Sequence, residues 1–152
     1  MVWTYTSNHL SFTCGMVLQG YDANMSDVFF KELGIPEPNI NLGISELNHG
    51  AMTGRMLEKL EAVMIKESPD LVLVYGDTNS TLSASLAASK LHIKIAHVES
   101  GLRSYNKLMP EEKNRLITDH LSDFLFCPTE TAVDNLRKEG LKNGVHLVGD
   151  IM

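Results

Sequence analysis

The segment LVLVYGDTNSTLSASLAASKLHIKIAHVESG, residues 71–101, decides the fold. It begins with LVLVYG (Leu71 to Gly76), an apolar run without polar alternation, which is typical of a strand buried on both faces of a parallel sheet. Residues 79–91 are rich in Ala, Leu and Ser, which predicts a helix whose small side chains pack closely on that sheet. The run IKIAHV (Ile93 to Val98) follows as a second strand. Strand, helix and strand in this order predict a βα unit of an α/β protein.

The same alternation continues to the end of the chain. The runs FLFC and VHLVG predict strands over residues 124–127 and 145–149, and helices are expected over 110–121 and 129–140. Upstream, apolar residues at helical spacing predict helices over 22–33 and 49–67. We therefore predict an α/β fold, a Rossmann-like parallel sheet flanked by helices. Residues 1–18 have no clean period and are expected to form an edge strand or a disordered lead.

Composition excludes several classes of function. The 152 residues carry a formal net charge of −6, which argues against nucleic acid or an anionic membrane as a partner. No apolar run approaches the roughly 20 residues of a membrane span, and no signal peptide is recognisable, so we expect a cytoplasmic protein. Cys14 and Cys127 lack metal or redox spacing, and no Walker or GxGxxG loop occurs. Neither a metal nor a cofactor is expected.

The first strand of the segment ends in Gly76-Asp77-Thr78, a place where α/β proteins bind ligands. Ligands of open α/β sheets lie beyond the carboxyl ends of the strands. Glycine lets the backbone approach a ligand, and Asp77 enters this crevice just before a helix N-terminus. The alternative is helix capping, because Asp, Thr, Asn and Ser are the preferred capping residues. Taken alone, this motif favours capping.

The second strand ends in HVESGLR, residues 97–103. Strand alternation places His97 and Glu99 on one side, so Glu99 is expected in the same crevice as Asp77. Two crowded carboxylates have pKa values that are pushed apart, which suits one of them to act as an acid and the other as a base. The alternative is an ion pair of Glu99 with Arg103 that has no function.

A third group follows in PEEKNR, residues 110–115. Glu111 and Arg115 are four residues apart and share a helix face. As an isolated pair they would stabilise the helix by only about 0.2–0.5 kcal/mol, and from the residues alone a structural role is the expected one. Arg103 and Arg115 have an alternative role as phosphate ligands, because a guanidinium offers paired donors to oxyanions.

The stretch from Pro69 to Gly140, with GDTNST, HVESGLRS and PEEKNR in order, resembles the non-hydrolysing UDP-N-acetylglucosamine 2-epimerases. It also resembles their relatives acting on UDP-2,3-diacetamido-2,3-dideoxy-glucuronate, and residues 21–44 and 49–57 extend the match. The resemblance implies two Rossmann-like domains, as in B-type glycosyltransferases, with the substrate between them. It further implies a homodimer, and C2 proton removal coupled to loss of UDP, followed by re-addition with opposite configuration, without nicotinamide or metal.

Residue roles follow from the same resemblance. It implies that Asp77, Glu99 and Glu111 are the acid and base candidates, and that Arg115 orients or neutralises charge near the leaving phosphate. Contacts with the UDP-sugar substrate are expected from Gly76, Thr78, His97, Arg103 and Gln19.

The sequence departs from the family pattern at its beginning. No glycine loop of the GTRPE kind occurs in residues 1–18, and the family's TGQHYD is LQGYD at residues 18–22, without the histidine. Residues 1–18 are therefore interpreted as an unassigned lead, and 19–152 as a partial first domain without the second. The alternatives are an inactive fragment, an epimerase of the diacetamido sugar, and a glycosyltransferase-B-like sugar transferase.

Overall fold

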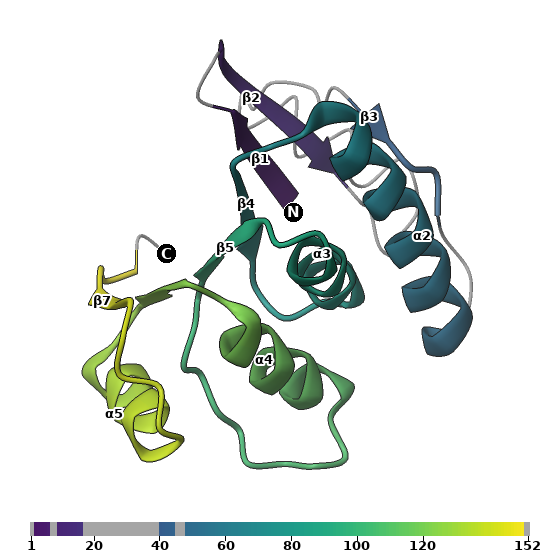
Figure 1. Cartoon of the computed structure of the whole chain (residues 1–152). Coiled ribbons are helices and arrows are strands. Elements are labelled where there is room, and N and C mark those ends of the chain that lie inside the picture. Colours follow the sequence, from purple (N-terminus) through teal and green to yellow (C-terminus); the bar gives the residue numbers. More distant parts are fainter. Residues whose placement is uncertain (1, 7–8, 17–39, 45–47, 151–152) are drawn as a thin grey trace, which may run out of the picture.

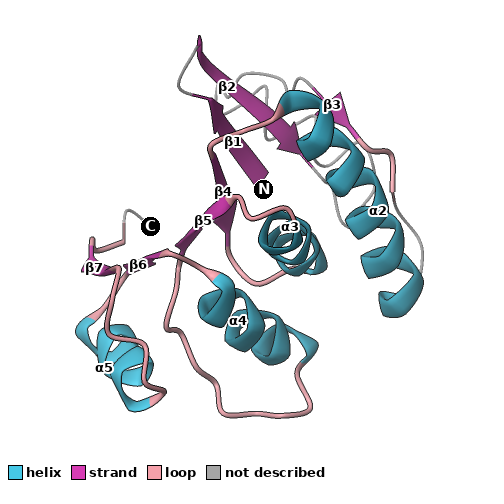
Figure 2. Cartoon of the chain, in the orientation of Figure 1, coloured by secondary structure: helices cyan, strands magenta, loops and turns pink. Residues whose placement is uncertain are grey.

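The computed structural model describes residues 2–6, 9–16, 40–44 and 48–150. Within them one sheet runs in the order β3-β2-β1-β4-β5-β6-β7, drawn in magenta in Figure 2. Its strands are β1 (Val2–Thr6), β2 (His9–Met16), β3 (Ile40–Asn41), β4 (Leu71–Tyr75), β5 (Lys94–Val98), β6 (Phe124–Cys127) and β7 (Val145–Leu147). The helices are α2 (His49–Glu67), α3 (Asn79–Lys90), α4 (Pro110–Leu121) and α5 (Glu130–Lys138). The helix expected over 22–33 lies outside the described residues.

The second half of the sheet has the predicted topology. Strands β4, β5, β6 and β7 pair in parallel and in sequence order. When successive parallel strands are added to a sheet in one direction, right-handed connections place all their helices on the same face of the sheet. Figure 1 shows α3, α4 and α5 on the same side of these strands. The carboxyl ends of all four strands consequently meet at one rim of the sheet. The predicted fold class is confirmed.

The N-terminal residues differ from the expectation. They form two strands, β1 and β2, which pair antiparallel as a hairpin, and β1 also pairs antiparallel with β4. Neither lies at the edge of the sheet, because the short β3 pairs with β2 in parallel beyond it. The N-terminal segment, predicted as an edge strand or disordered, therefore forms internal strands of the sheet. Its antiparallel pairing interrupts the parallel pattern next to β4.

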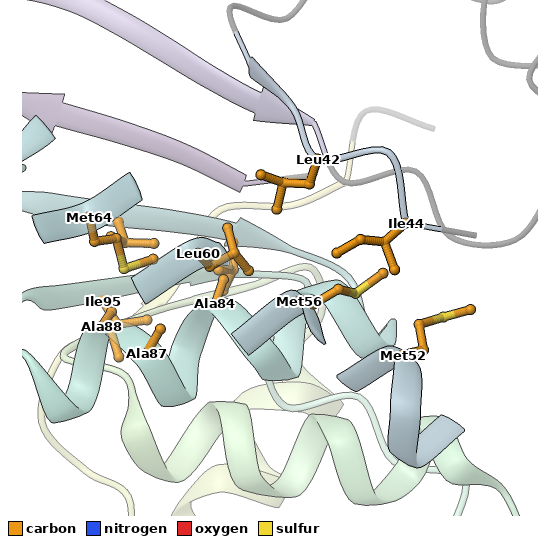
Figure 3. Packing of buried hydrophobic residues seen from close by; sticks show 12 residues of the cluster. Leu42, Ile44, Met52, Met56, Leu60, Met64, Ala84, Ala87, Ala88 and Ile95 are labelled. Atoms are coloured by element: carbon orange, nitrogen blue, oxygen red, sulfur yellow. The ribbon is translucent and has the colours of Figure 1, made fainter. Parts of the chain in front are cut away.

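A core of small and flexible side chains joins α2 to α3 and the sheet (Figure 3). The stripe predicted on α2 is confirmed, because its methionines and Leu60 are at most 5% exposed. Opposite them, α3 presents Ala84, Ala87 and Ala88, whose small size lets the two helix backbones approach closely. The buried members of this cluster are Leu42, Ile44, Met52, Met56, Leu60, Met64, Val72, Val74, Ala84, Ala87, Ala88 and Ile95.

Candidate active site

Two backbone turns at the rim bring the first strand ends together. Gly76 follows β4 with φ of 74°, and Glu99 follows β5 with φ of 71°, a conformation that is uncommon for a residue with a side chain. The Gly76 N–H donates to the carbonyl of Val98 over 3.2 Å. A Cβ added to Gly76 would lie 3.5 Å from Oε2 of Glu99. Because Gly76 has no side chain, the Glu99 carboxylate lies next to the turn without a side chain between them.

Glu99 is half-buried and surrounded by other acids. Burial raises the pKa of its carboxyl, and the carboxylates of Asp77 and Asp150 raise it further. The Tyr75 hydroxyl donates a hydrogen bond to Glu99, which opposes the rise. Because the strand ends at Val98 and φ is positive at Glu99, simple alternation no longer decides where this side chain points. The crowded carboxylates that the strand ends predicted are present.

Asp77 binds an arginine rather than capping α3. Its Oδ2 accepts from Nε of Arg115 over 2.9 Å and from Nη2 over 2.6 Å. The N-cap of α3 is Thr78, whose exposed side chain contacts the Ser80 hydroxyl over 2.6 Å without capping a backbone N–H. The capping alternative is therefore wrong for Asp77, whose carboxylate remains 29% exposed at the rim.

Glu112, and not Glu111, is the partner of Arg115 within helix α4. Oε2 of Glu112 accepts from Nη1 of Arg115 over 2.8 Å, so the predicted pair of Glu111 with Arg115 is wrong. Glu112 also accepts from the N–H and hydroxyl of Ser104 and from the N–H of Tyr105, over 2.9–3.0 Å. Burial opposes its ionisation, but these hydrogen bonds together lower its pKa to about 2. Glu111 lies half-buried in the first turn of α4.

Arg103 and His97 are placed beneath the rim. Arg103 pairs with Asp119 and Glu139, so the predicted ion pair with Glu99 is wrong. Burial opposes its charge, but the hydrogen bonds and charges of these two carboxylates raise the pKa of the guanidinium. The His97 side chain is fully buried against Asp119 and the Gly76 carbonyl. Both residues were expected as substrate ligands, and this placement favours a supporting role.

The sequence reasoning missed three polar groups at or below the rim: Asn114, Asp119 and Asp150. Asn114 is buried, and its amide donates to the Asp77 carbonyl over 2.8 Å and to Oδ1 of Asn79 over 3.3 Å. Asp150 follows strand β7, so the strand-end rule that selected Asp77 and Glu99 would have found it. Asp119 had no local signal, because its partners come from distant parts of the chain. Gln19 lies outside the described residues.

Within residues 2–6, 9–16, 40–44 and 48–150, no cluster of three His, Cys, Asp or Glu side chains could hold a metal ion. Nor does any helix in that part of the chain have the length and apolar character needed to cross a membrane. The chemistry available at the rim is that of carboxylates, a tyrosine hydroxyl and one guanidinium. Such a set can move protons and neutralise an anionic ligand.

Comparison with known proteins shows the family of this chain. A family model described as UDP-N-acetylglucosamine 2-epimerase matches residues 6–152. The chain belongs to this family. The resemblance read from the sequence motifs is thereby confirmed, and the rim carboxylates belong to an epimerase-family chain.

Individual relatives support the same family membership. A UDP-N-acetylglucosamine 2-epimerase homolog of Methanococcus maripaludis is 60% identical over 134 residues, which are 88% of this chain and 38% of the relative. The UDP-2,3-diacetamido-2,3-dideoxy-D-glucuronate 2-epimerase of Pseudomonas aeruginosa is 58% identical over 137 residues, which are 88% of this chain and 39% of that protein.

A solved structure shows the same fold. It is the crystal structure of Methanocaldococcus jannaschii UDP-GlcNAc 2-epimerase in complex with UDP-GlcNAc and UDP, with a TM-score of 0.83 at 51% identity. The match covers 86% of this chain and 36% of that chain. This epimerase-family chain therefore spans less than two fifths of the length of these relatives.

Proposed function

We propose that this chain supplies the acid–base part of a UDP-N-acetylglucosamine 2-epimerase site. The observation that carries the proposal is the pair of carboxylates, Asp77 and Glu99, at neighbouring strand ends of a chain in this family. Enzymes that remove a proton and return it commonly use two neighbouring carboxyl groups for the two steps. The raised pKa of Glu99 keeps this carboxyl protonated to a higher pH than an ordinary glutamate, which suits it to donate a proton.

The proposed reaction inverts C2 of the sugar. A carboxylate takes the C2 proton, the C–H electrons form the C1–C2 double bond, and the C1–O bond breaks so that UDP leaves with its electron pair. UDP then adds back to the 2-acetamidoglucal-like intermediate while C2 accepts a proton on the opposite face. Asp77, Glu99 and Glu111 are the proposed proton carriers, and Arg115 neutralises charge near the leaving phosphate.

The proposal extends to the surroundings of the site. The ligand is a UDP-sugar, held also by Thr78 and by Gln19. We expect a homodimer, which is the habit of the family, and a cytoplasmic location, in keeping with two cysteines that lack redox or metal spacing.

Proton NMR in deuterated water tests the proposal. The chain is incubated with UDP-N-acetylglucosamine while deuterium at C2 and the manno epimer are followed. We expect both signals, and we expect Asp77→Asn to lose them by at least about a hundredfold, the usual contribution of acid–base catalysis. Asp134→Asn is the matched control, because Asp134 is an exposed carboxylate on α5 away from the rim. Unchanged substrate with the folded chain would contradict epimerase activity for these residues.

A second substrate is favoured by one comparison. The 58% identity to the Pseudomonas aeruginosa enzyme makes UDP-2,3-diacetamido-2,3-dideoxy-glucuronate the next sugar to test. Epimerisation of this sugar and not of UDP-N-acetylglucosamine would move the proposal to the diacetamido substrate. Consumption of either sugar nucleotide only when an acceptor is added would instead indicate a glycosyltransferase.

A further inference from the structure

His97 is held from both sides at the end of β5. Its Nε2 lies 2.9 Å from the carbonyl oxygen of Gly76, and its Nδ1 lies 2.7 Å from Oδ1 of Asp119. The side chains of both His97 and Asp119 are 0% exposed, so neither ring nitrogen has water as an alternative partner. The two contacts therefore decide which protons the ring carries.

Both partners of the ring are acceptors. A carbonyl oxygen can only accept, so Nε2 must carry a proton. The other carboxylate oxygen of Asp119 accepts from Nη1 of Arg103 over 2.7 Å and from the N–H of Gly101 over 3.1 Å. A carboxylate with this many donors, including a guanidinium, is stabilised as an anion and has no proton to give to Nδ1. Nδ1 must therefore donate as well, and a ring that donates from both nitrogens is an imidazolium.

The charges around His97 lead to the same result. Arg103 pairs with two carboxylates, Asp119 and Glu139, which leaves the cluster one negative charge in excess. A cationic His97 neutralises that excess, and buried charges are tolerated when they are paired. The other titratable groups that face this region are Glu99 after β5, Asp77 after β4 and the buried Cys127 thiol of β6.

We propose that His97 is a buried imidazolium that positions the Gly76–Asp77 turn and does not contact the substrate. It holds the carbonyl of Gly76 from below, while the amide of Asn114 holds the carbonyl of Asp77 from α4. Its positive charge also lies close enough to act on the Glu99 carboxylate, where it opposes the effect of burial. The protonation state stands without the proposed function, whereas its consequence for catalysis rests on it.

Long-range proton–nitrogen NMR of the histidine-labelled chain tests the protonation state. We expect both ring nitrogens of His97 to carry protons at neutral pH, with the signal assigned by its loss in His97→Gln. His120, exposed on α4, provides the internal reference signal. One protonated and one unprotonated nitrogen on His97 at neutral pH would overturn the proposal.

Kinetics of the C2 exchange test the positioning role. His97→Gln should lower kcat roughly tenfold while leaving KM unchanged, because the turn moves and no substrate contact is lost. Losing the positive charge also raises the pKa of Glu99, so the acidic limb of the pH profile should move to higher pH. His120→Gln is the matched control. A rise in KM with unchanged kcat would instead make His97 a substrate ligand. If the wild-type chain shows no exchange, the proposed function fails, and the NMR result still decides the state of His97.

Discussion

Arg103 and Arg115 each pair with two carboxylates, yet their surroundings differ. Arg103 belongs to the loop that follows β5, and it binds Asp119 and Glu139 with its own side chain 1% exposed. Arg115 binds Asp77 and Glu112 with its side chain 16% exposed, at the rim of the sheet. One cluster is closed to solvent except at Glu139, whose side chain is 23% exposed, and the other is open at both Arg115 and Asp77.

The difference lies in what else each carboxylate touches. Asp119 also meets His97 and the backbone of Gly101, so all its oxygens are used inside the protein. Asp77 has one oxygen on Arg115 and is 29% exposed, which leaves it accessible to a ligand from solvent. An ion cluster that is shielded from solvent holds a loop in place, whereas one that is exposed to solvent can bind a ligand and react with it. Stability measurements should therefore separate the two clusters.

The largest effect is expected for Asp119→Ala. The variant leaves Arg103 and His97 as buried cations with fewer partners, and breaking a buried pair in this way costs about 3–5 kcal/mol of unfolding free energy. Urea unfolding of the chain measures it. Asp134→Ala is the control, because Asp134 is exposed and should lie within about 0.5 kcal/mol of the wild type. A loss below about 1 kcal/mol for Asp119→Ala would remove the distinction between the clusters.

The next effect compares one glycine from each region. A Cβ on Gly101 would run into the Ala132 carbonyl of α5, at a φ of 79° that disfavours a side chain. A Cβ on Gly76, at φ of 74°, meets only the Glu99 carboxylate at ordinary contact distance. We expect Gly101→Ala to cost about 3 kcal/mol from strain and overpacking, and Gly76→Ala about 1–2 kcal/mol from strain alone. Equal thermal unfolding temperatures for the two variants would show that α5 moves away from the new methyl group without a loss of stability.

The third effect is expected at Glu112, and it depends on pH. Because the folded pKa is lowered to about 2, the charge of Glu112 stabilises the fold above the unfolded pKa near 4.5, and this stability is lost as pH falls toward 2. Glu112→Gln should therefore cost about 2–3 kcal/mol at neutral pH and progressively less in acid. Urea unfolding at several pH values measures the difference.

The exposed Glu61 of α2 provides the control for Glu112. Glu61→Gln should give a small difference from the wild type that changes little between neutral and acidic pH. A Glu112→Gln difference that stayed constant down to pH 2 would show that the loop contacts of Ser104 and Tyr105 do not depend on the charge.

The sequence predicted the elements that repeat and missed those that depend on distant partners. Apolar periodicity was sufficient for β4 to β7 and for the buried face of α2, since each is decided by local spacing. It failed for β1, whose pairing with β4 joins residues about seventy positions apart. Strand ends predicted Asp77 and Glu99. Helix spacing could not choose between Glu111 and Glu112 for Arg115, because the choice is made by the N–H groups of residues 104 and 105.

Strands β4, β5, β6 and β7 lie in the sheet in the same order as in the chain, and this order has a consequence for how such proteins diverge. Each added strand contributes one loop to the same rim, and the residues that follow it can change while the strand stays buried. Two relatives named for different sugars each match this chain at more than half of the aligned positions, with 60% and 58% identity. On such a scaffold, selection for a new sugar can act on a few loop positions and leave the folding of the sheet undisturbed.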